Sequence, residues 1–268
     1  MVIVAASINT RFVILETSQA RSSADIDALA RSGLALAAAK ITARENLQQV
    51  AGSFSARFDN GMIDGSYRNS AGLVDINTAT IELLDAVFAY SGMVSAQRRR
   101  ALAGRVVDWR DDDGQRILDG GDELDNYSDP LNPTPKNGPF SSVLELAQVP
   151  GFTEDERLRL DRLLTVSAGI GTVHPVLIHP GILAAISGIS DDGVRRLKQL
   201  NVGDSDQILE IAASEPAIEG LVSQAISVSW QIEMSLSLAN DKTKNVVATI
   251  AFVPNDHRLF RVIEMDTR

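Results

Sequence analysis

The sequence contains no cysteine, which excludes thiolate zinc sites, iron–sulfur clusters, a cysteine nucleophile and a disulfide scaffold. Its three histidines, His174, His179 and His257, are too few for a histidine-rich metal site. Aromatic residues make up 5% of the chain, so few side chains are available to line a sugar-binding cleft. No apolar run reaches the roughly 20 residues that a membrane-spanning helix needs.

The length of 268 residues allows one large or two modest domains, and the hydrophobic content of 44% is typical of a globular chain. Acidic residues outnumber basic ones by 35 to 25, which gives a net charge of −10. Because nucleic-acid affinity comes largely from lysine and arginine contacts with phosphate, this charge disfavours DNA or RNA binding. It also disfavours adsorption to anionic lipid.

Residues 1–49 are predicted to form one long helix, since they contain no proline and a single glycine, Gly33. Apolar residues recur at helical spacing: Ile8, Phe12, Leu15, Ile26, Leu29, Leu34, Ala37, Ala38, Ile41 and Leu47. Such a helix runs about 70 Å, longer than a compact domain can cover, so we expect a projecting stem. The apolar start lacks a signal-peptide cleavage site. Two interpretations remain open for it, the end of a longer apolar helix or an ordinary buried helix.

Both flanks of the middle section are predicted to form strands. Residues 53–59 alternate apolar and polar side chains, Asn60-Gly61 and Asp64-Gly65 are turn signals, and LVDIN (73–77) is typical of a short strand. β-Branched, alternating segments follow at 224–238, 245–253 and 259–265. We therefore predict one sheet domain from residues 50–77 and 215–268, with a helical domain, 78–214, inserted between them.

The helical middle repeats one pattern three times, in LLDAVFAYSGMVSAQRRRAL, VLELAQVPGFTEDERLRLDRLL and ILAAISGISDDGVRRLKQL. Each repeat has a glycine where a helix ends in a left-handed residue. Each then has a Ser or Thr (Ser95, Thr153 and Ser190) where the next helix needs an N-cap. This spacing predicts three helix–hairpin–helix units.

Residues 108–129 hold nine acidic side chains against Arg110 and Arg116, a local charge of −7. Carboxylates at this density repel one another unless water or a cation screens them. Calcium, which takes six to eight oxygen ligands in flexible loops, is one candidate, and a solvated acidic loop without metal is the other. The spacing of Asp111, Asp113 and Gln115 imitates an EF-hand. A true EF-hand is excluded because Arg116 stands where the sharp-turn glycine belongs.

Enzymatic activity is not expected. Paired carboxylates suggest glycoside hydrolysis, but no acidic residue is isolated in an apolar context that would raise its pKa. The Arg98–Arg100 run is the strongest nucleic-acid signal, since helix–hairpin–helix modules bind phosphate through turn backbone and nearby basic groups. The acidic stretch that begins a few residues later opposes this role.

Three blocks in order, LVDINTATIELL with RVVDWRDDDG, then GDELDNY with PKNGPFSSVLELAQVPG, then the β-rich tail, carry a family resemblance. The chain resembles the K-type minor pseudopilin of the bacterial type II secretion system (general secretion pathway protein K). The resemblance runs from about residue 20 to 265, and ARSGLALAAAKI looks like part of the family's N-terminal helix. It departs in the third repeat, where TVHPVLIHPGILAAI replaces an LVDINTAT-like entry.

The resemblance implies an α+β fold: a long N-terminal helix, a pseudopilin αβ sheet domain and a large all-helical inserted domain with helix–hairpin–helix (SAM-like) repeats. It implies I-type and J-type minor pseudopilins as partners, and a location in the bacterial periplasm with inner-membrane anchoring by an N-terminal helix. We expect the anchoring part of that helix to be absent from this chain. It also implies bound calcium, one or two ions.

The resemblance places the calcium ligands on the family's acidic pattern, at Asp111, Asp113, Asp122, Glu123 and Asp125, with Asp119 and Asp129 in reserve. The predicted function is a structural, non-enzymatic subunit that caps the pseudopilus tip and helps to initiate its assembly. The rival is a helix–hairpin–helix protein of the competence type that binds DNA non-specifically. Duplex binding with a steep salt dependence favours the rival, and complex formation with other pseudopilins favours the tip subunit.

Overall fold

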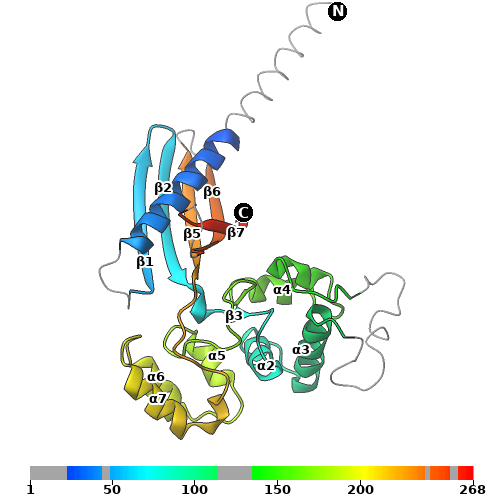
Figure 1. Cartoon of the computed structure of the whole chain (residues 1–268). Coiled ribbons are helices and arrows are strands. Elements are labelled where there is room, and N and C mark those ends of the chain that lie inside the picture. Colours follow the sequence, from blue (N-terminus) through cyan, green and yellow to red (C-terminus); the bar gives the residue numbers. More distant parts are fainter. Residues whose placement is uncertain (1–22, 44–48, 114–134, 239–241, 254–258, 268) are drawn as a thin grey trace, which may run out of the picture. The chain divides into compact units, whose positions relative to one another are not determined.

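The computed structural model describes residues 23–43, 49–113, 135–238, 242–253 and 259–267, which belong to two units of the chain (Figure 1). The first unit combines residues from both ends, up to Arg68 and from Trp230 onward, and the second runs from Asn69 to Ser229. Each unit has its own cluster of buried apolar side chains. Among the described residues, no helix is both long enough and apolar enough to cross a bilayer.

The first unit is built on a five-stranded sheet of order β1-β2-β5-β6-β7. Its strands are β1 (Ala51–Phe58), β2 (Gly61–Asn69), β5 (Ser229–Leu238), β6 (Thr243–Ala251) and β7 (Arg261–Thr267). Strands β1 and β2 pair antiparallel, as do β6 and β7. The strands predicted at 53–59, 224–238, 245–253 and 259–265 appear in this sheet, although the second of them begins only at Ser229. The strand predicted at 73–77 does not belong to it.

A helix over residues 23–42 lies across one face of this sheet (Figure 1). Its buried side chains recur every three or four residues, at Leu29, Ala30, Leu34, Ala37, Ala38 and Ile41. They pack against sheet residues such as Ile63, Ile232 and Ile250. This part of the predicted stem is helical. Residues 49 and 50 are not, so the helix ends before the predicted boundary, and residues 1–22 lie outside the described part.

The Asp64-Gly65 pair lies inside β2 and forms no turn, so that turn signal is misleading. Gly65 stands directly opposite Phe54 of β1. A Cβ atom at position 65 would come within 2.5 Å of the Phe54 ring, so glycine here makes room for an aromatic side chain. The hairpin itself turns at Asp59 and Asn60, as the Asn-Gly signal predicts.

The two ends of the second unit lie next to each other. Asn69 Nδ2 donates to the Ser227 carbonyl over 2.8 Å, and Ser227 N–H donates back to Asn69 Oδ1 over 3.0 Å. Strand β3 (Val74–Asp75) pairs in parallel with β4 (Leu164–Thr165) within this unit. The boundaries therefore lie at 68/69 and 229/230, whereas the sequence placed them at 77/78 and 214/215, because LVDIN pairs with the helical unit.

The regular secondary structure of the second unit consists mainly of short helices around a large apolar core. The α-helices are α2 (Ile81–Tyr90), α3 (Ala96–Arg110), α4 (Glu154–Leu160), α5 (Pro180–Ala185), α6 (Asp191–Lys198) and α7 (Ser205–Ser214). The 3₁₀ helices are η1 (Ser70–Gly72), η3 (Val143–Ala147) and η4 (Pro216–Ile218). An isolated parallel bridge also joins Val173 to Val222.

The three predicted helix turns have the expected chemistry. Gly92, Gly151 and Gly188 have φ values of +99°, +98° and +93°, the left-handed region that glycine adopts without strain. The hydroxyl groups of Ser95, Thr153 and Ser190 then accept hydrogen bonds from the N3 amides of α3, α4 and α6. Thr153 and Glu156 form a full capping box. The capping predictions are confirmed, although a 3₁₀ helix, η3, precedes Gly151.

His174 lies outside the helices and strands and is fully buried. Its Nδ1 accepts from Val176 N–H at 3.3 Å, and its Nε2 has no hydrogen-bond partner. Burial lowers the pKa of His174 to about 4, and the nearby Lys198 ammonium acts in the same direction. Lys198 in turn donates to the carbonyls of Val176 and Ile178, and burial lowers its pKa to about 8. The imidazole is therefore neutral in the folded protein.

Acid is predicted to destabilise the second unit through His174. Above pH 6.5 the imidazole is neutral in both states, but between pH 6.5 and 4 the unfolded chain takes up the proton first. The free energy of unfolding should fall by about 1–2 kcal/mol at pH 5. Urea unfolding of wild type and His174→Asn at pH 7.5, 6 and 5 measures this, with His179→Asn at the exposed α5 N-cap as the matched control. Equal pH slopes in wild type and His174→Asn would contradict the prediction.

Candidate functional site

The acidic stretch begins where α3 ends. Asp111 is the C-cap residue of α3, and its N–H bonds to the Val107 carbonyl over 3.0 Å. Asp113 follows two residues later and is exposed. Asp122, Glu123 and Asp125 lie outside the described residues, as do Asp119 and Asp129. Within the described ranges, no group of three acidic or histidine side chains could hold a metal ion.

Asp111 has an electrostatic environment that favours a cation. Its Oδ1 atom is buried and has no hydrogen-bond partner. Burial raises the pKa of the Asp111 carboxyl, and Asp113 and Asp112 raise it further, while Arg110 acts in the opposite direction. An unpartnered carboxylate oxygen among neighbouring carboxylates is a hard donor of the kind that calcium binds. The described part of the predicted ligand set fits the ion.

Arg110 is directed away from the acidic stretch. Its guanidinium donates to the carbonyls of Ile76 and Ala79, the latter over 2.7 Å. Burial lowers the pKa of Arg110, and the charges of Asp75 and Asp111 raise it. Because the guanidinium bonds to the backbone of residues 76–79, it holds the end of α3 against the segment that follows β3.

Asn77 holds the chain where it returns from the acidic stretch. Phe140 N–H donates to Asn77 Oδ1 over 2.7 Å, and Asn77 Nδ2 donates to the carbonyls of Phe140 and Val166 over 3.0 and 3.2 Å. The rings of Trp109 and Phe140 lie 6.2 Å apart, and Gly138 N–H reaches the Trp109 carbonyl at 3.4 Å. The described residues that flank the stretch are therefore tied to one short segment, residues 76–79.

The Asp75 carboxylate also stabilises the segment of residues 76–79, through the hydrogen bonds that it accepts. Its Oδ1 accepts from Asn77 N–H over 2.9 Å, and its Oδ2 accepts from Gly169 N–H over 2.8 Å. Burial raises the pKa of the Asp75 carboxyl, while these two N–H groups and Arg110 oppose the rise. LVDIN is predicted as a strand from its sequence, but these roles of Asp75 and Asn77 are not predicted. The available signal was a pair of polar residues, Asp75 and Asn77, within an apolar strand.

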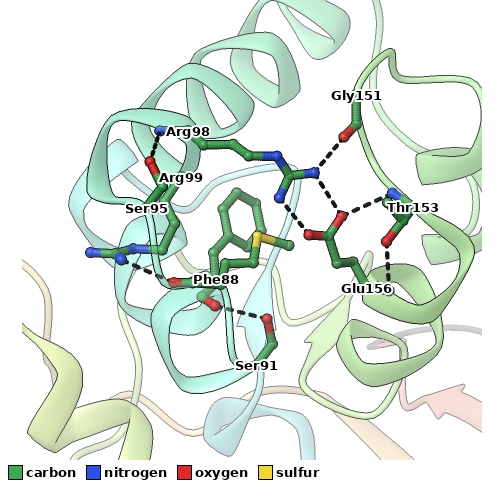
Figure 2. A network of polar contacts seen from close by, with 9 residues as sticks. Phe88, Ser91, Ser95, Arg98, Arg99, Gly151, Thr153 and Glu156 are labelled. Atoms are coloured by element: carbon green, nitrogen blue, oxygen red, sulfur yellow. Dashed lines mark hydrogen bonds and ion pairs between the residues drawn. The ribbon is translucent and has the colours of Figure 1, made fainter.

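Two arginines of the run between the first two turns, Arg98 and Arg99, bind groups of the protein itself (Figure 2). Arg98 donates to both carboxylate oxygens of Glu156 and to the Gly151 carbonyl. Arg99 pairs with Asp85 over 2.9 Å and donates to the carbonyls of Met93 and Val94, each over 3.0 Å. Two of the three guanidinium groups therefore stabilise the turns and are unavailable to phosphate.

Arg100 is the exposed member of the run. It lines a cavity of about 290 Å³, together with the acidic side chains of Glu82 and Asp85 and a floor of apolar residues. A basic residue beside two carboxylates makes a poor phosphate site. The geometry of this region therefore supports a packing role for the arginines and counts against DNA binding.

Glu156 couples the first two turns electrostatically. Its hydrogen bond from Arg98 lowers the pKa of the Glu156 carboxyl to about 2, although burial opposes the shift. Its side chain is 10% exposed, and it also accepts from Thr153 N–H over 2.9 Å. The sequence showed the T-x-x-E capping signature here, but no local pattern indicated that Arg98, 58 residues away, would be its partner.

Comparisons with known proteins agree on one family. A family model described as type II secretion system, protein K, matches residues 35–169. A solved chain from the complex of GspK, GspI and GspJ of the enterotoxigenic Escherichia coli type 2 secretion system has a similar fold, with a TM-score of 0.67. The two chains are 16% identical, and the match covers 97% of this chain and 99% of that one. No curated protein matches the sequence.

Removing the Arg98 side chain should destabilise the second unit by about 2 kcal/mol, because it leaves the Glu156 carboxylate buried without its cation. Arg98→Ala is compared with Arg100→Ala, which removes the same charge from an exposed neighbour and should cost within about 0.5 kcal/mol. Urea unfolding at neutral pH measures both. An equal loss of unfolding free energy in the two variants would show that the Arg98 contacts do not stabilise the unit.

Proposed function

Since the family match spans half of the chain, the protein belongs to the type II secretion system protein K family, and we propose that it is a minor pseudopilin that caps the pseudopilus tip and helps to initiate assembly. The fold similarity over nearly the full length of both chains is the observation that carries this proposal. We place the protein in the bacterial periplasm, anchored to the inner membrane.

The proposed capping mechanism is steric. The sheet unit supplies a helix of the kind that packs into a filament, and its residues 23–42 bury one face against the sheet. The second unit, Asn69–Ser229, is the larger one and has a separate apolar core. A unit of that size on a filament subunit blocks addition of the next subunit, so the filament ends where this protein is incorporated.

We assign the three glycine turns of the second unit to helix–hairpin–helix modules that serve packing. Their arginines bind carbonyl and carboxylate groups inside the unit, as Arg98 and Arg99 do. The overall charge of −10 acts against phosphate binding as well. This argument supports a structural, non-catalytic subunit and leaves the DNA-binding alternative as an outcome for experiment.

We propose I-type and J-type minor pseudopilins as the partners, since the similar solved chain was crystallised in such a complex. Mixing this protein with the periplasmic domains of both partners should yield one three-protein species on size-exclusion chromatography with light scattering. Duplex DNA in place of the partners is the comparison arm, and it should leave the elution unchanged. Absence of the complex, or a DNA complex with steep salt dependence, would overturn the proposed function.

Calcium is proposed as the ion of the acidic stretch, held by Asp111 and Asp113 and, outside the described residues, by Asp122, Glu123 and Asp125. When bound, the ion supplies positive charge that offsets carboxylate repulsion. The support is the buried, unpartnered Asp111 Oδ1 and the fixation of both ends of the stretch by Arg110 and Asn77. Residues held in place at both ends lose less conformational freedom when they bind an ion.

Calcium should therefore raise the thermal midpoint, and magnesium should raise it less. At 100 times the dissociation constant, binding adds about 2.7 kcal/mol, which corresponds to roughly 5–10 °C for a unit of this size. The double variant Asp111→Ala/Asp113→Ala should lose most of the rise in thermal midpoint that calcium produces. The matched control is Asp112→Ala, an exposed neighbour of equal charge outside the ligand set. Melting curves insensitive to calcium and chelator would refute the metal site and leave the fold unaffected.

A further inference from the structure

The cavity beside Arg100 lies within the second unit and is built from segments that are far apart in the sequence. Its apolar lining comes from the start of α2, the end of α5 and the chain at and after η4: Ile81, Ile186, Ala217 and Leu221. A cavity of about 150 Å³ already holds a benzene molecule. This one, at about 290 Å³, therefore has room for a large apolar side chain.

The floor and walls of the cavity are ordered by contacts of the protein itself. Ile186 and Leu221 are 4% and 7% exposed and belong to the apolar core of the unit. Ile186 N–H donates to the Leu183 carbonyl over 3.2 Å, and Leu221 N–H donates to the Ile218 carbonyl over 3.0 Å. Helix α2 begins with a side-chain N-cap. Because the walls are already ordered, an occupant pays little conformational entropy to bind there.

Three charged side chains line the cavity, and they are not equivalent. The Asp85 carboxylate accepts from Arg99 Nε over 2.9 Å, and these two side chains are 18% and 14% exposed. Glu82 and Arg100 are exposed, and within the described part of the chain neither side chain has a hydrogen bond or an ion pair. The cavity therefore offers one free carboxylate and one free guanidinium beside an apolar floor.

These groups restrict the chemistry of an occupant. Phosphate is disfavoured because Glu82 and Asp85 repel it, and a divalent cation is disfavoured because Arg100 repels it. A purely apolar molecule would fill the floor but would take water from two charges without replacing their hydrogen bonds. An occupant that carries an apolar group together with one positive and one negative group satisfies the floor and both charges.

The origin of the two free charges favours a peptide segment over a small zwitterion. Glu82 belongs to α2 and Arg100 to α3, and the two side chains do not pair with each other. The positive and negative groups of an occupant must therefore be separated as well. Side chains on either side of an apolar residue in a peptide have this separation, whereas the two charges of a free amino acid are attached to one carbon atom.

We propose that this cavity binds a partner protein by taking one apolar side chain from an exposed segment, with a basic and an acidic residue flanking that side chain. The apolar side chain contacts Ile186 and Leu221, the basic residue pairs with Glu82, and the acidic residue pairs with Arg100. Interfaces commonly depend on a few side chains of this kind that fill preformed pockets. The proposal does not depend on the proposed place of this protein at the pseudopilus tip.

Short peptides with both ends blocked test the proposal, because only their side chains carry charge. The charged probes are Gly-Lys-Leu-Asp-Gly and Gly-Asp-Leu-Lys-Gly, and the comparison probes are Gly-Gln-Leu-Asn-Gly and Gly-Lys-Gly-Asp-Gly. The readout is the methyl NMR signals of Ile186 and Leu221 in the whole chain. At least one charged probe should shift both signals saturably, with a Kd of about 1 mM or lower. The comparison probes should bind about tenfold more weakly, since each lacks either the charges or the apolar side chain.

Variants assign the two charges and the floor. Glu82→Gln and Arg100→Gln should each weaken binding of the charged probe about threefold to fivefold. Glu82→Lys should make Gly-Asp-Leu-Asp-Gly the preferred probe, and that gain also shows that the variant folds. Ala217→Phe should fill the cavity and abolish binding. Asp155→Asn is the matched control, since Asp155 is the second residue of α4 as Glu82 is of α2, and is exposed outside the cavity.

Four results would overturn the proposal. The first is unshifted Ile186 and Leu221 signals at about five times the expected Kd, where binding is nearly complete. The second is equal binding of charged and neutral probes, and the third is an equal loss of binding in Asp155→Asn and Glu82→Gln. The fourth comes from free leucine as a further probe. If it binds more tightly than every blocked peptide, the cavity takes a small zwitterion and the assignment to a partner protein is wrong.

Discussion

The structure depends on one constraint, the adjacency of β2 and β5 in the sheet. The chain leaves the sheet after β2 and returns 160 residues later as the neighbouring strand, so the second unit must start and finish at one place. Asn69 and Ser227 satisfy this requirement with two reciprocal hydrogen bonds to each other. A unit closed in this way can gain or lose size without changing the register of the sheet.

In the second unit, Arg98, Arg99 and Arg110 donate to carbonyl or carboxylate groups of the unit itself, so they stabilise turns and helix ends. Within the part of the chain that the structure describes, the Asp111 Oδ1 atom is buried and has no hydrogen-bond partner. A charge run in a sequence therefore does not indicate a nucleic-acid site until its partners are known.

Local chemistry was predictable from the sequence, and long-range pairing was not. The caps at Ser95, Thr153 and Ser190 need only the residues around them, so the predicted turns are correct. The unit boundaries were displaced because β3 pairs with β4, about 90 residues further on, and no local pattern encodes that contact. Burial of His174 and the hydrogen bonds of Asn77 depend on distant segments in the same way. Three of the five predicted ligands, Asp122, Glu123 and Asp125, lie outside the described residues and remain a prediction.

Each of the two units has an apolar core of its own. One core contains helix 23–42 and the sheet, and the other contains the helices of the second unit. Within the second unit, Asp75, Asn77 and Arg110 bind backbone groups from segments up to 94 residues apart. Polar side chains that join distant backbone in this way favour one arrangement over competing ones, because any shift leaves buried groups unpaired. The second unit is therefore held in one arrangement by its own hydrogen bonds.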